Sequence, residues 1–300
     1  MNLTTLAAVR QWVGSQTGTD DALLQRLIGE ASQTALNYMQ RKDIALQTVT
    51  EIQSGKGTSK LQLRNWPVVA VNSLIIDTQA IPQAANSSAY GYFLEQNYGS
   101  IASQPQFIAM SGVNCAGVGA FPNGQGVTAY RQDNYASGRP FTRGVGNVTI
   151  NYTFGYAIQG EAQTIPSALT IVPNQPSGSF LQDLGVQFAS NGTALTPVSS
   201  SPTTGQYIPP SVSGDTPTLV YTFAAADVGK AVLLNYNFVP YDMEQAVIEL
   251  VGERYRYRGR IGEASRTLGG QETASYMVKD PFTASIKTRL EAYKIGWDVR

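Results

Sequence analysis

The sequence predicts an α+β protein: a small helical bundle from the N- and C-terminal helices, a β-rich middle segment, and an inserted module resembling a β-sandwich or barrel. Three observations lead to this prediction. Apolar residues recur at helical spacing near both ends of the chain, and the period changes to alternation between them. An apolar strand carrying Asn-Tyr-x-Phe also occurs twice, at residues 148–156 and 232–241.

The two similar strands suggest how the middle of the chain is organised. We predict the N-terminal helices at residues 1–47, a β-rich segment at 48–166, an inserted β module at 167–239 and the C-terminal helices at 240–300. The insertion lies directly ahead of a helix, and surface positions of this kind tolerate added modules. The alternative is that residues 148–241 form one continuous sheet in which two strands are similar by chance.

Two helices are predicted near the N-terminus. Thr4 or Thr5 is suited to cap the first helix, and Gly14 is suited to end it. Asp20 and Asp21 then open a longer helix. Its apolar face comprises Leu24, Leu27, Ile28, Ala31, Ala35, Tyr38 and Met39.

Strands are predicted from about Thr48 onward. Leu61 and Leu63 alternate, and residues 68–77 form a strand after the Trp66-Pro67 break. A second clear strand has alternating apolar positions at Val148, Ile150, Tyr152 and Phe154.

The helix around which the chain is organised runs from Pro240 to about Arg260. Its apolar face is expected to contain Met243, Ala246, Val247, Leu250, Val251 and Tyr255. Its last turns alternate arginine and tyrosine. One interpretation is a helix that buries one face and solvates a basic end; the other is a protein–protein interface, where Tyr and Arg are enriched.

A last helix is predicted after a polar, Gly- and Ser-rich connector. Asp280 is a suitable N-cap, with Pro281 at the first helical position. The apolar stripe of this helix comprises Phe282, Ile286, Leu290, Tyr293 and Trp297.

Composition excludes several classes of function. The 21 Lys and Arg residues balance the 21 Asp and Glu residues, so no overall basic field favours nucleic acid. With one cysteine, Cys115, no intrachain disulfide is possible. No apolar run is long enough for a membrane helix, and the first residues resemble no signal peptide.

No catalytic constellation is recognisable. Histidine, the commonest general base and metal ligand, is absent. Asp20 with Asp21 suits a helix N-terminus, and Glu249 with Glu253 suits an ion network on a helix. The Gly-rich stretch 117–126 lacks the Lys-Ser/Thr of a phosphate-binding loop. We therefore expect no enzyme, no cofactor and no metal.

Four stretches together resemble a head–tail connector, or head-completion adaptor, of tailed bacteriophages. They are TLAAVRQWVG followed by TDDALLQRLIGEASQTALNYMQR, then LQLRNWPVVAVNSL, GNVTINYTFGY and VPYDMEQAVIELVGERYRYRGRIGEASRTLGGQETASY. The resemblance covers about two thirds of the chain, and its specificity lies in the order of the four stretches. The module at 167–239 departs from minimal members of the family.

The resemblance implies a structural virion protein, made in the host cytoplasm. Copies would form a ring, usually of twelve, beneath the portal, extend the DNA channel used in genome ejection, and dock the next tail component, a stopper or nozzle protein. DNA would pass through without specific binding, and no membrane is involved. The hypothesised contact residues, toward a neighbouring copy or the portal, are Arg254, Tyr255, Arg256, Tyr257, Arg258 and Arg260. A second set would dock in a groove of the portal or complete the bundle: Phe282, Ile286, Leu290, Tyr293 and Trp297.

Two other functions are open at this stage. The β-rich, Tyr- and Asn-rich middle also suits a carbohydrate-binding or depolymerising tail module, which would place aromatic side chains on one exposed sheet face. A cytosolic hydrolase would need an activated nucleophile, and none is found in the sequence.

Overall fold

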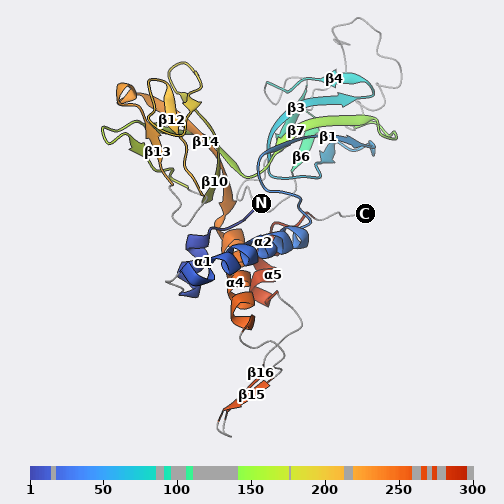
Figure 1. Ribbon diagram of the computed structural model, residues 1–300. Coiled ribbons are helices and arrows are strands. Elements are labelled where there is room, and N and C mark those ends of the chain that lie inside the picture. The colour runs from blue at the N-terminus through green and yellow to red at the C-terminus, as the bar shows by residue number, and fades with distance from the viewer. Residues whose placement is uncertain are drawn as a thin grey trace, which may run out of the picture. The chain divides into compact units, whose positions relative to one another are not determined.

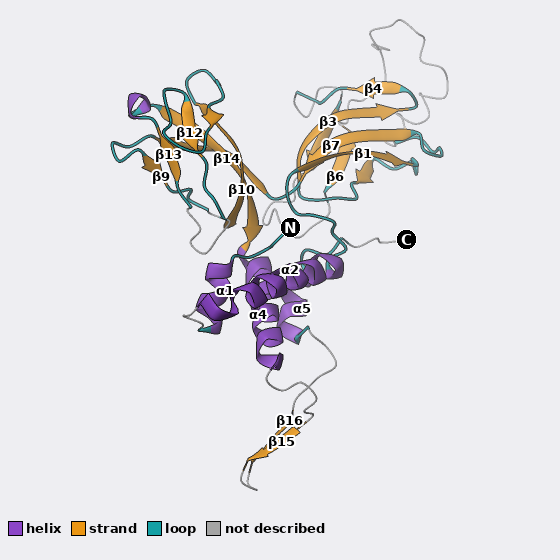
Figure 2. Ribbon diagram, in the orientation of Figure 1, coloured by secondary structure: helices purple, strands orange, loops and turns teal. Residues whose placement is uncertain are grey.

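The structure is a computed structural model that describes residues 1–14, 18–85, 91–95, 106–110, 141–175, 177–212, 219–258, 265–268, 272–275 and 282–295. The chain divides into two compact units. The first contains Met1–Ala45 and Tyr156–Gly296, and the second contains Leu46–Gly155. Helices and antiparallel sheets both occur, which confirms the predicted α+β class (Figure 2).

The N-terminal helices form as the sequence predicts. Helix α1 spans Leu6–Val13; the Thr5 hydroxyl accepts a hydrogen bond from the Ala8 amide, and Gly14 closes the helix at φ 75°. The short 3₁₀ helix η1, Gly18–Asp20, leads into α2, Asp21–Tyr38. Because Thr5 and Gly14 are suitable capping residues, the ends of α1 could be predicted from local sequence.

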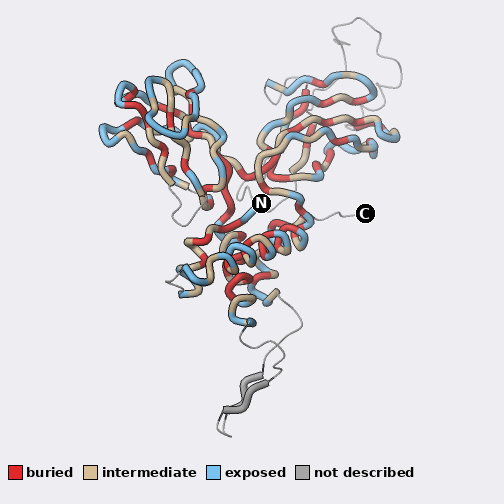
Figure 3. The backbone as a smooth tube through the Cα atoms, in the orientation of Figure 1, coloured by how far each residue is buried: buried red, intermediate tan, exposed pale blue. Residues whose placement is uncertain are grey.

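Helix α4, Tyr241–Tyr257, begins directly where strand β14 ends (Figure 1). Its buried residues are Met243, Ala246, Val247, Ile248, Leu250, Val251 and Gly252. Tyr255, which was predicted on this apolar face, is half-buried, and its hydroxyl bonds to Asp20 at the start of α2. The buried residues lie in the middle of α4, and both of its ends are intermediate or exposed (Figure 3).

Helix α5 is shorter than predicted. It spans Ala284–Glu291, and the Thr283 hydroxyl caps it by accepting a hydrogen bond from the Ile286 amide at 3.3 Å. Phe282 therefore precedes the helix, and Tyr293 follows it in a turn. The predicted cap, Asp280 with Pro281, lies outside the described residues. Between α4 and α5, strands β15, Ser265–Leu268, and β16, Glu272–Ser275, pair antiparallel.

The second unit contains two antiparallel sheets. One has the order β1-β7-β3-β4, and the other has the order β2-β6-β5. Their bounds are β1 Gln47–Gln53, β2 Lys60–Gln62, β3 Val68–Ile76, β4 Gln79–Ile81, β5 Tyr92–Glu95, β6 Phe107–Met110 and β7 Val148–Phe154.

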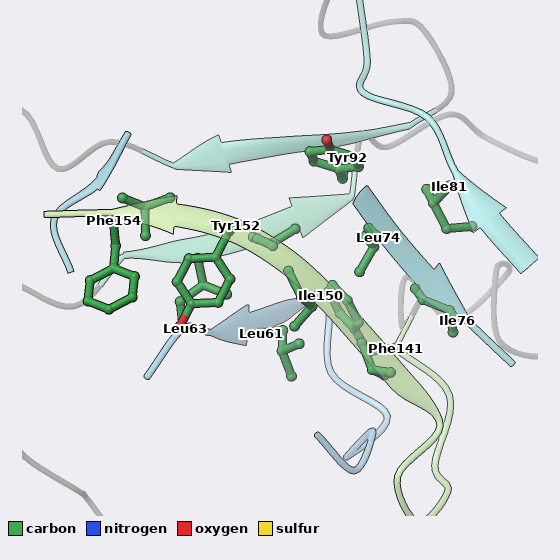
Figure 4. Close-up of a cluster of buried hydrophobic side chains, with 13 residues drawn as sticks. Leu61, Leu63, Leu74, Ile76, Ile81, Tyr92, Phe141, Ile150, Tyr152 and Phe154 are labelled. Carbon is green, nitrogen blue, oxygen red and sulfur yellow. The ribbon is translucent and has the colours of Figure 1, made fainter. Parts of the chain in front are cut away.

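Both of these sheets contribute to one apolar core. The four alternating residues of β7 are buried as predicted, and they pack with Leu61 and Leu63 from the segment that contains β2. Figure 4 shows the side chains of this core gathered along β7. Strict alternation suits a strand with one buried face, so it predicted β7 correctly.

The remaining strands belong to the first unit. One antiparallel sheet has the order β10-β14-β8. A second, mixed sheet has the order β11-β12-β13-β9, in which β11 and β12 pair parallel. Their bounds are β8 Ala157–Thr164, β9 Thr170–Ile171, β10 Gly178–Phe188, β11 Thr196–Pro197, β12 Gln206–Ile208, β13 Tyr221–Phe223 and β14 Ala231–Pro240, with a 3₁₀ turn η2 at Ala225–Asp227.

The two similar strands lie in different sheets. Strand β7 pairs with β1 and β3, whereas β14 pairs with β10 and β8. The alternative of one continuous sheet over residues 148–241 is therefore wrong. The sheet of β14 includes β8, which precedes residue 167, and the predicted segment bounds stay a prediction.

Candidate assembly surface around α4

Helix α4 is the centre of the helical part of the first unit. It contacts α1, α2 and α5, as well as strands β14 and β10. Met243, Val247 and Leu250 are fully buried between these elements. A helix in this position can present only the residues at its margins to a partner, so the margins of α4 are the candidate surface.

On the side toward α2, Arg254 is already engaged within the chain. Its guanidinium lies 3.5 Å from the Glu30 carboxylate, and it donates a hydrogen bond to the Thr34 hydroxyl at 3.2 Å. Both partners lie one turn apart on α2. Arg254 therefore helps to attach α4 to α2.

The end of α4 is bound to the start of α2 through Asp20. The Tyr255 hydroxyl donates to Asp20 Oδ2 at 2.5 Å, and Arg258 donates to both carboxylate oxygens at 2.9 and 3.2 Å. The Arg258 guanidinium also lies 4.4 Å from the centre of the Tyr255 ring. The hydrogen bond from Arg258, followed by that from Tyr255, lowers the pKa of Asp20.

The opposite side of α4 borders a groove of about 220 Å³. Successive helix residues are about 100° apart, so Arg256 points roughly 200° away from Arg254. The groove is lined by Trp12 of α1, by Glu249, Gly252, Glu253 and Arg256 of α4, and by Thr283 and Ile286 at the start of α5.

Trp12 is the residue that sequence reasoning missed. Its side chain is 49% exposed, and it lies across α4 at Gly252, where an added Cβ would come 3.0 Å from the indole Nε1. The sequence signal was a large aromatic residue two positions before Gly14, the predicted end of the first helix. A half-exposed Trp is notable because Trp is among the residues most enriched in binding hot spots.

The predicted aromatic and apolar anchors near α5 are mostly used inside the chain. Ile286 and Leu290 are fully buried, and Tyr293 is nearly so. The Phe282 ring packs 5.0 Å from that of Tyr38. Tyr257 is half-buried at the end of α4, while Arg260 and Trp297 lie outside the described residues.

A second cavity, of about 580 Å³, lies where the first residues of the chain meet β10 and the start of α4. Glu244 lines it and accepts hydrogen bonds from the hydroxyls of Thr4 and Ser179. Burial raises the pKa of the Glu244 carboxyl, and the two hydrogen bonds oppose this rise. This carboxyl joins α4 to the N-terminal segment and to the β module.

Within the ranges given above, no group of three or more His, Cys, Asp or Glu side chains is arranged to hold a metal ion. No helix in the same ranges is long and apolar enough to cross a membrane. Cys115 and the Gly-rich stretch 117–126 lie outside the described residues.

The comparison with known protein families found a match for the first third of the chain. Residues 2–106 match the family model described as Head completion protein, which confirms the resemblance to phage head-completion adaptors. The match indicates a structural role in a bacteriophage head and a place in the virion. It covers α1 and α2, with Trp12 and Asp20, and ends ahead of α4. No curated protein matches the sequence.

Proposed function

We propose that this protein is a head–tail adaptor, of which several copies, twelve by family resemblance, form a ring beneath the portal. The ring extends the DNA channel and docks the next tail component. The observation that carries the proposal is the match of residues 2–106 to the head-completion family. It is supported by a chain whose positive and negative charges balance, which suits a channel that DNA crosses without specific binding.

The proposal assigns a role to each part of the chain. Helices α1, α2, α4 and α5 are the small bundle of the adaptor core, and residues 167–239 are an added sandwich- or barrel-like module directed at an outer partner. Of the predicted contact residues, Arg256 and Tyr257 remain at the margin of α4. The side chains of the other three are hydrogen-bonded to α2 or to Asp20 at its start: Arg254, Tyr255 and Arg258. The bundle therefore forms within each copy, and the ring forms through its margins.

The carbohydrate-binding alternative depends on aromatic side chains at a sheet surface. In the described part of the β module, Tyr207, Tyr221 and Tyr236 are fully buried, and Phe180 and Phe223 nearly so. The hydroxyls of Tyr207 and Tyr221 donate to Asp183 at 2.5 and 2.9 Å. These rings build the interior of the module, so no observation favours the alternative.

The test is the mass of the purified particle, alone and mixed with purified portal rings. We expect a closed ring of identical copies, either free or templated by the portal, visible by native mass spectrometry and electron microscopy. A strict monomer that ignores the portal ring contradicts the proposal. Binding of the chain to a polysaccharide, with no assembly, would favour the alternative.

A further inference from the structure

The cavity of about 580 Å³ lies where the first six residues of the chain meet α2, β10 and the start of α4, and we call it the N-terminal cavity. Glu244 is the only charged side chain among the residues that line it. The apolar part of the wall comprises Leu3, Leu6, Ile28, Phe180, Leu181 and Val239. A concave, mainly apolar site of this size with one polar group is typical of sites that bind a small organic group.

The Glu244 carboxylate has no basic partner. One of its oxygens accepts a hydrogen bond from the Thr4 hydroxyl at 3.3 Å, and the other accepts from the Ser179 hydroxyl. These are the only interactions of this side chain within the ranges that the structure describes. By contrast, Glu249 on the same helix lies 3.5 Å from the Arg289 guanidinium. The charge of Glu244 is therefore balanced only by two neutral hydroxyls and by the N-terminal end of α4.

This imbalance selects the charge of a ligand. Burial raises the pKa of Glu244, which means that the surroundings disfavour the carboxylate form. A cation in the cavity would stabilise that form, whereas an anion would be repelled by it. A purely apolar ligand would leave the carboxylate further desolvated and without a counter-charge, which is costly. The site therefore favours a cation.

The shape of the site selects the kind of cation. The apolar wall suits a hydrocarbon chain behind the charged group, and this wall would exclude water from the ion pair. Both oxygens of Glu244 already accept a hydroxyl. A guanidinium fork would need both oxygens at once, whereas an ammonium is a compact point charge that pairs with one of them. An ammonium on an alkyl chain therefore fits better than a guanidinium.

We propose that the N-terminal cavity binds a primary ammonium at the end of an alkyl chain, with Glu244 as its counter-charge. A lysine side chain of another protein and a free alkylamine both carry this group. The chain of the ligand lies against Ile28 and Phe180, and its ammonium donates a hydrogen bond to the Glu244 carboxylate. The site joins three elements, so a bound ligand would hold the N-terminal segment and β10 onto α4.

The experiment uses the full chain and three probes with the same hydrocarbon chain: n-hexylamine, n-hexanol and hexanoate. Isothermal titration calorimetry at neutral pH, where the amine is protonated, measures each affinity. We expect hexylamine to bind about tenfold more tightly than hexanol, because its hydrogen bond to the carboxylate is charged. Hexanoate should not bind. Equal affinities for the amine and the alcohol, or no binding of the amine, would overturn the inference.

Variants locate the binding. Glu244→Gln should reduce the affinity for hexylamine to that for hexanol, whereas Asp242→Asn, at an exposed carboxyl in the same turn, should leave it unchanged. Gln25→Trp places a large ring at an exposed position of the cavity wall and should block all binding. Gln33→Trp makes the same change at an exposed position of α2 that does not line the cavity, and should have no effect. Wild-type affinity of Glu244→Gln or Gln25→Trp, each with a wild-type melting curve, would show that the amine binds elsewhere.

A last measurement distinguishes the two sources of the ammonium. Assembly and binding to portal rings are followed by mass photometry with and without saturating hexylamine. If the amine weakens either one, the natural ligand is a lysine of another protein chain; if neither changes, it is a free alkylamine. The inference does not depend on the proposed ring. Rings that form in a protein that ignores hexylamine would overturn the inference alone, and a monomer that binds hexylamine through Glu244 but ignores the portal would overturn the adaptor function alone.

Discussion

Arg258 and Asp20 are 238 positions apart in the sequence, yet the Arg258 guanidinium donates a bidentate pair of hydrogen bonds to the Asp20 carboxylate, at 2.9 and 3.2 Å. The first residue closes α4 and the second opens α2. Half of the basic end of α4 is thus used to hold the helices of one copy together. Among the arginines at this end that the structure describes, Arg254 and Arg258 contact α2 or the residue that opens it, whereas Arg256 borders the groove.

Asp20→Asn should lower the melting temperature at neutral pH. The neutral amide has one acceptor oxygen instead of two, so it cannot form the charged, bidentate pair with the Arg258 guanidinium. Bonding to Arg258 lowers the pKa of Asp20 in the folded state below its ordinary 3.8. The stabilisation by this pair is therefore present above the pKa of Asp20 in the unfolded chain. It is lost as pH falls through the lower pKa that Asp20 has in the folded state. Thermal melts from pH 7 to pH 2.5 should show the wild type and the variant converging at the acidic end. Because the pair is exposed, added salt should also narrow the difference.

Arg256→Ala should leave the melting temperature within about a degree of wild type, since Arg256 is exposed and substitutions at exposed positions change stability little. Arg254→Ala and Arg258→Ala should each lower it, because each removes a contact with α2. The order reverses for assembly, where Arg256→Ala should be the most harmful of the three. Equal melting temperatures for the three variants would show that the side of α4 on which an arginine lies does not matter.

Gly252→Ala should affect the assembly of copies without destabilising the single copy. Alanine favours a helix over glycine by about 1 kcal/mol, but the new Cβ would lie 3.0 Å from the Trp12 Nε1. The indole is at the surface and can move aside, so the monomer should be as stable as wild type or slightly more stable, and association should weaken. Gly29→Ala in α2 is the matched control, because its Cβ would meet only Asn2 Oδ1 at 4.0 Å. It should stabilise the helix by a similar amount and leave assembly unchanged.

Glu244→Gln should stabilise the protein at pH 7.5 and have less effect at pH 4. Burial raises the folded pKa of Glu244 above its ordinary 4.5, so the neutral acid is the form that the fold favours. Its favourable contribution is present below pH 4.5 and is lost as pH rises through the folded pKa. The glutamine side chain stays neutral throughout and retains an oxygen for Ser179 or Thr4. Differences in melting temperature of a few degrees are expected, and Asp242→Asn, an exposed carboxyl on the same turn, should show no such trend.

Tyr152→Phe should destabilise the second unit by roughly 1–3 kcal/mol, the usual cost when a buried charged acceptor loses a donor. The Tyr152 hydroxyl donates to the buried Glu51 carboxylate at 2.6 Å and accepts from Asn65. Tyr92→Phe is a milder comparison, because the hydroxyl of Tyr92 donates to a neutral acceptor, the Val71 carbonyl, at 3.0 Å. Denaturant melts measure both. A Tyr92 variant that is the less stable of the two would contradict the importance of the Glu51 contact.

The elements that sequence predicted best are those with local signals. Thr5 and Gly14 bound α1 because a side-chain hydroxyl and a left-handed residue satisfy helix ends by themselves. Strand β7 followed from alternation, which needs only one buried face. The start of α5 was misplaced because Thr283, three residues beyond the predicted cap, bonds to the Ile286 amide instead.

The candidate surface was predictable only in part. The Tyr- and Arg-rich end of α4 was recognised as a contact region, but the sequence did not show that Arg254 and Arg258 meet α2. Trp12 was missed because its exposure depends on where α4 and α5 lie against α1. For Ile286 and Leu290 the sequence left two roles open, docking to the portal or completing the bundle, and the structure buries both within the chain.

By itself the sequence determined the mixed α+β class, the balance of charge, the absence of histidine and the family resemblance that residues 2–106 share with head-completion proteins. These follow from composition, period and capping, which are local properties of the chain. Only the tertiary structure decided which arginines are bound within one copy and which border the Trp12 groove. The reason is that a helix turns about 100° at each residue, so adjacent letters of one motif face different neighbours, and those neighbours come from distant parts of the chain.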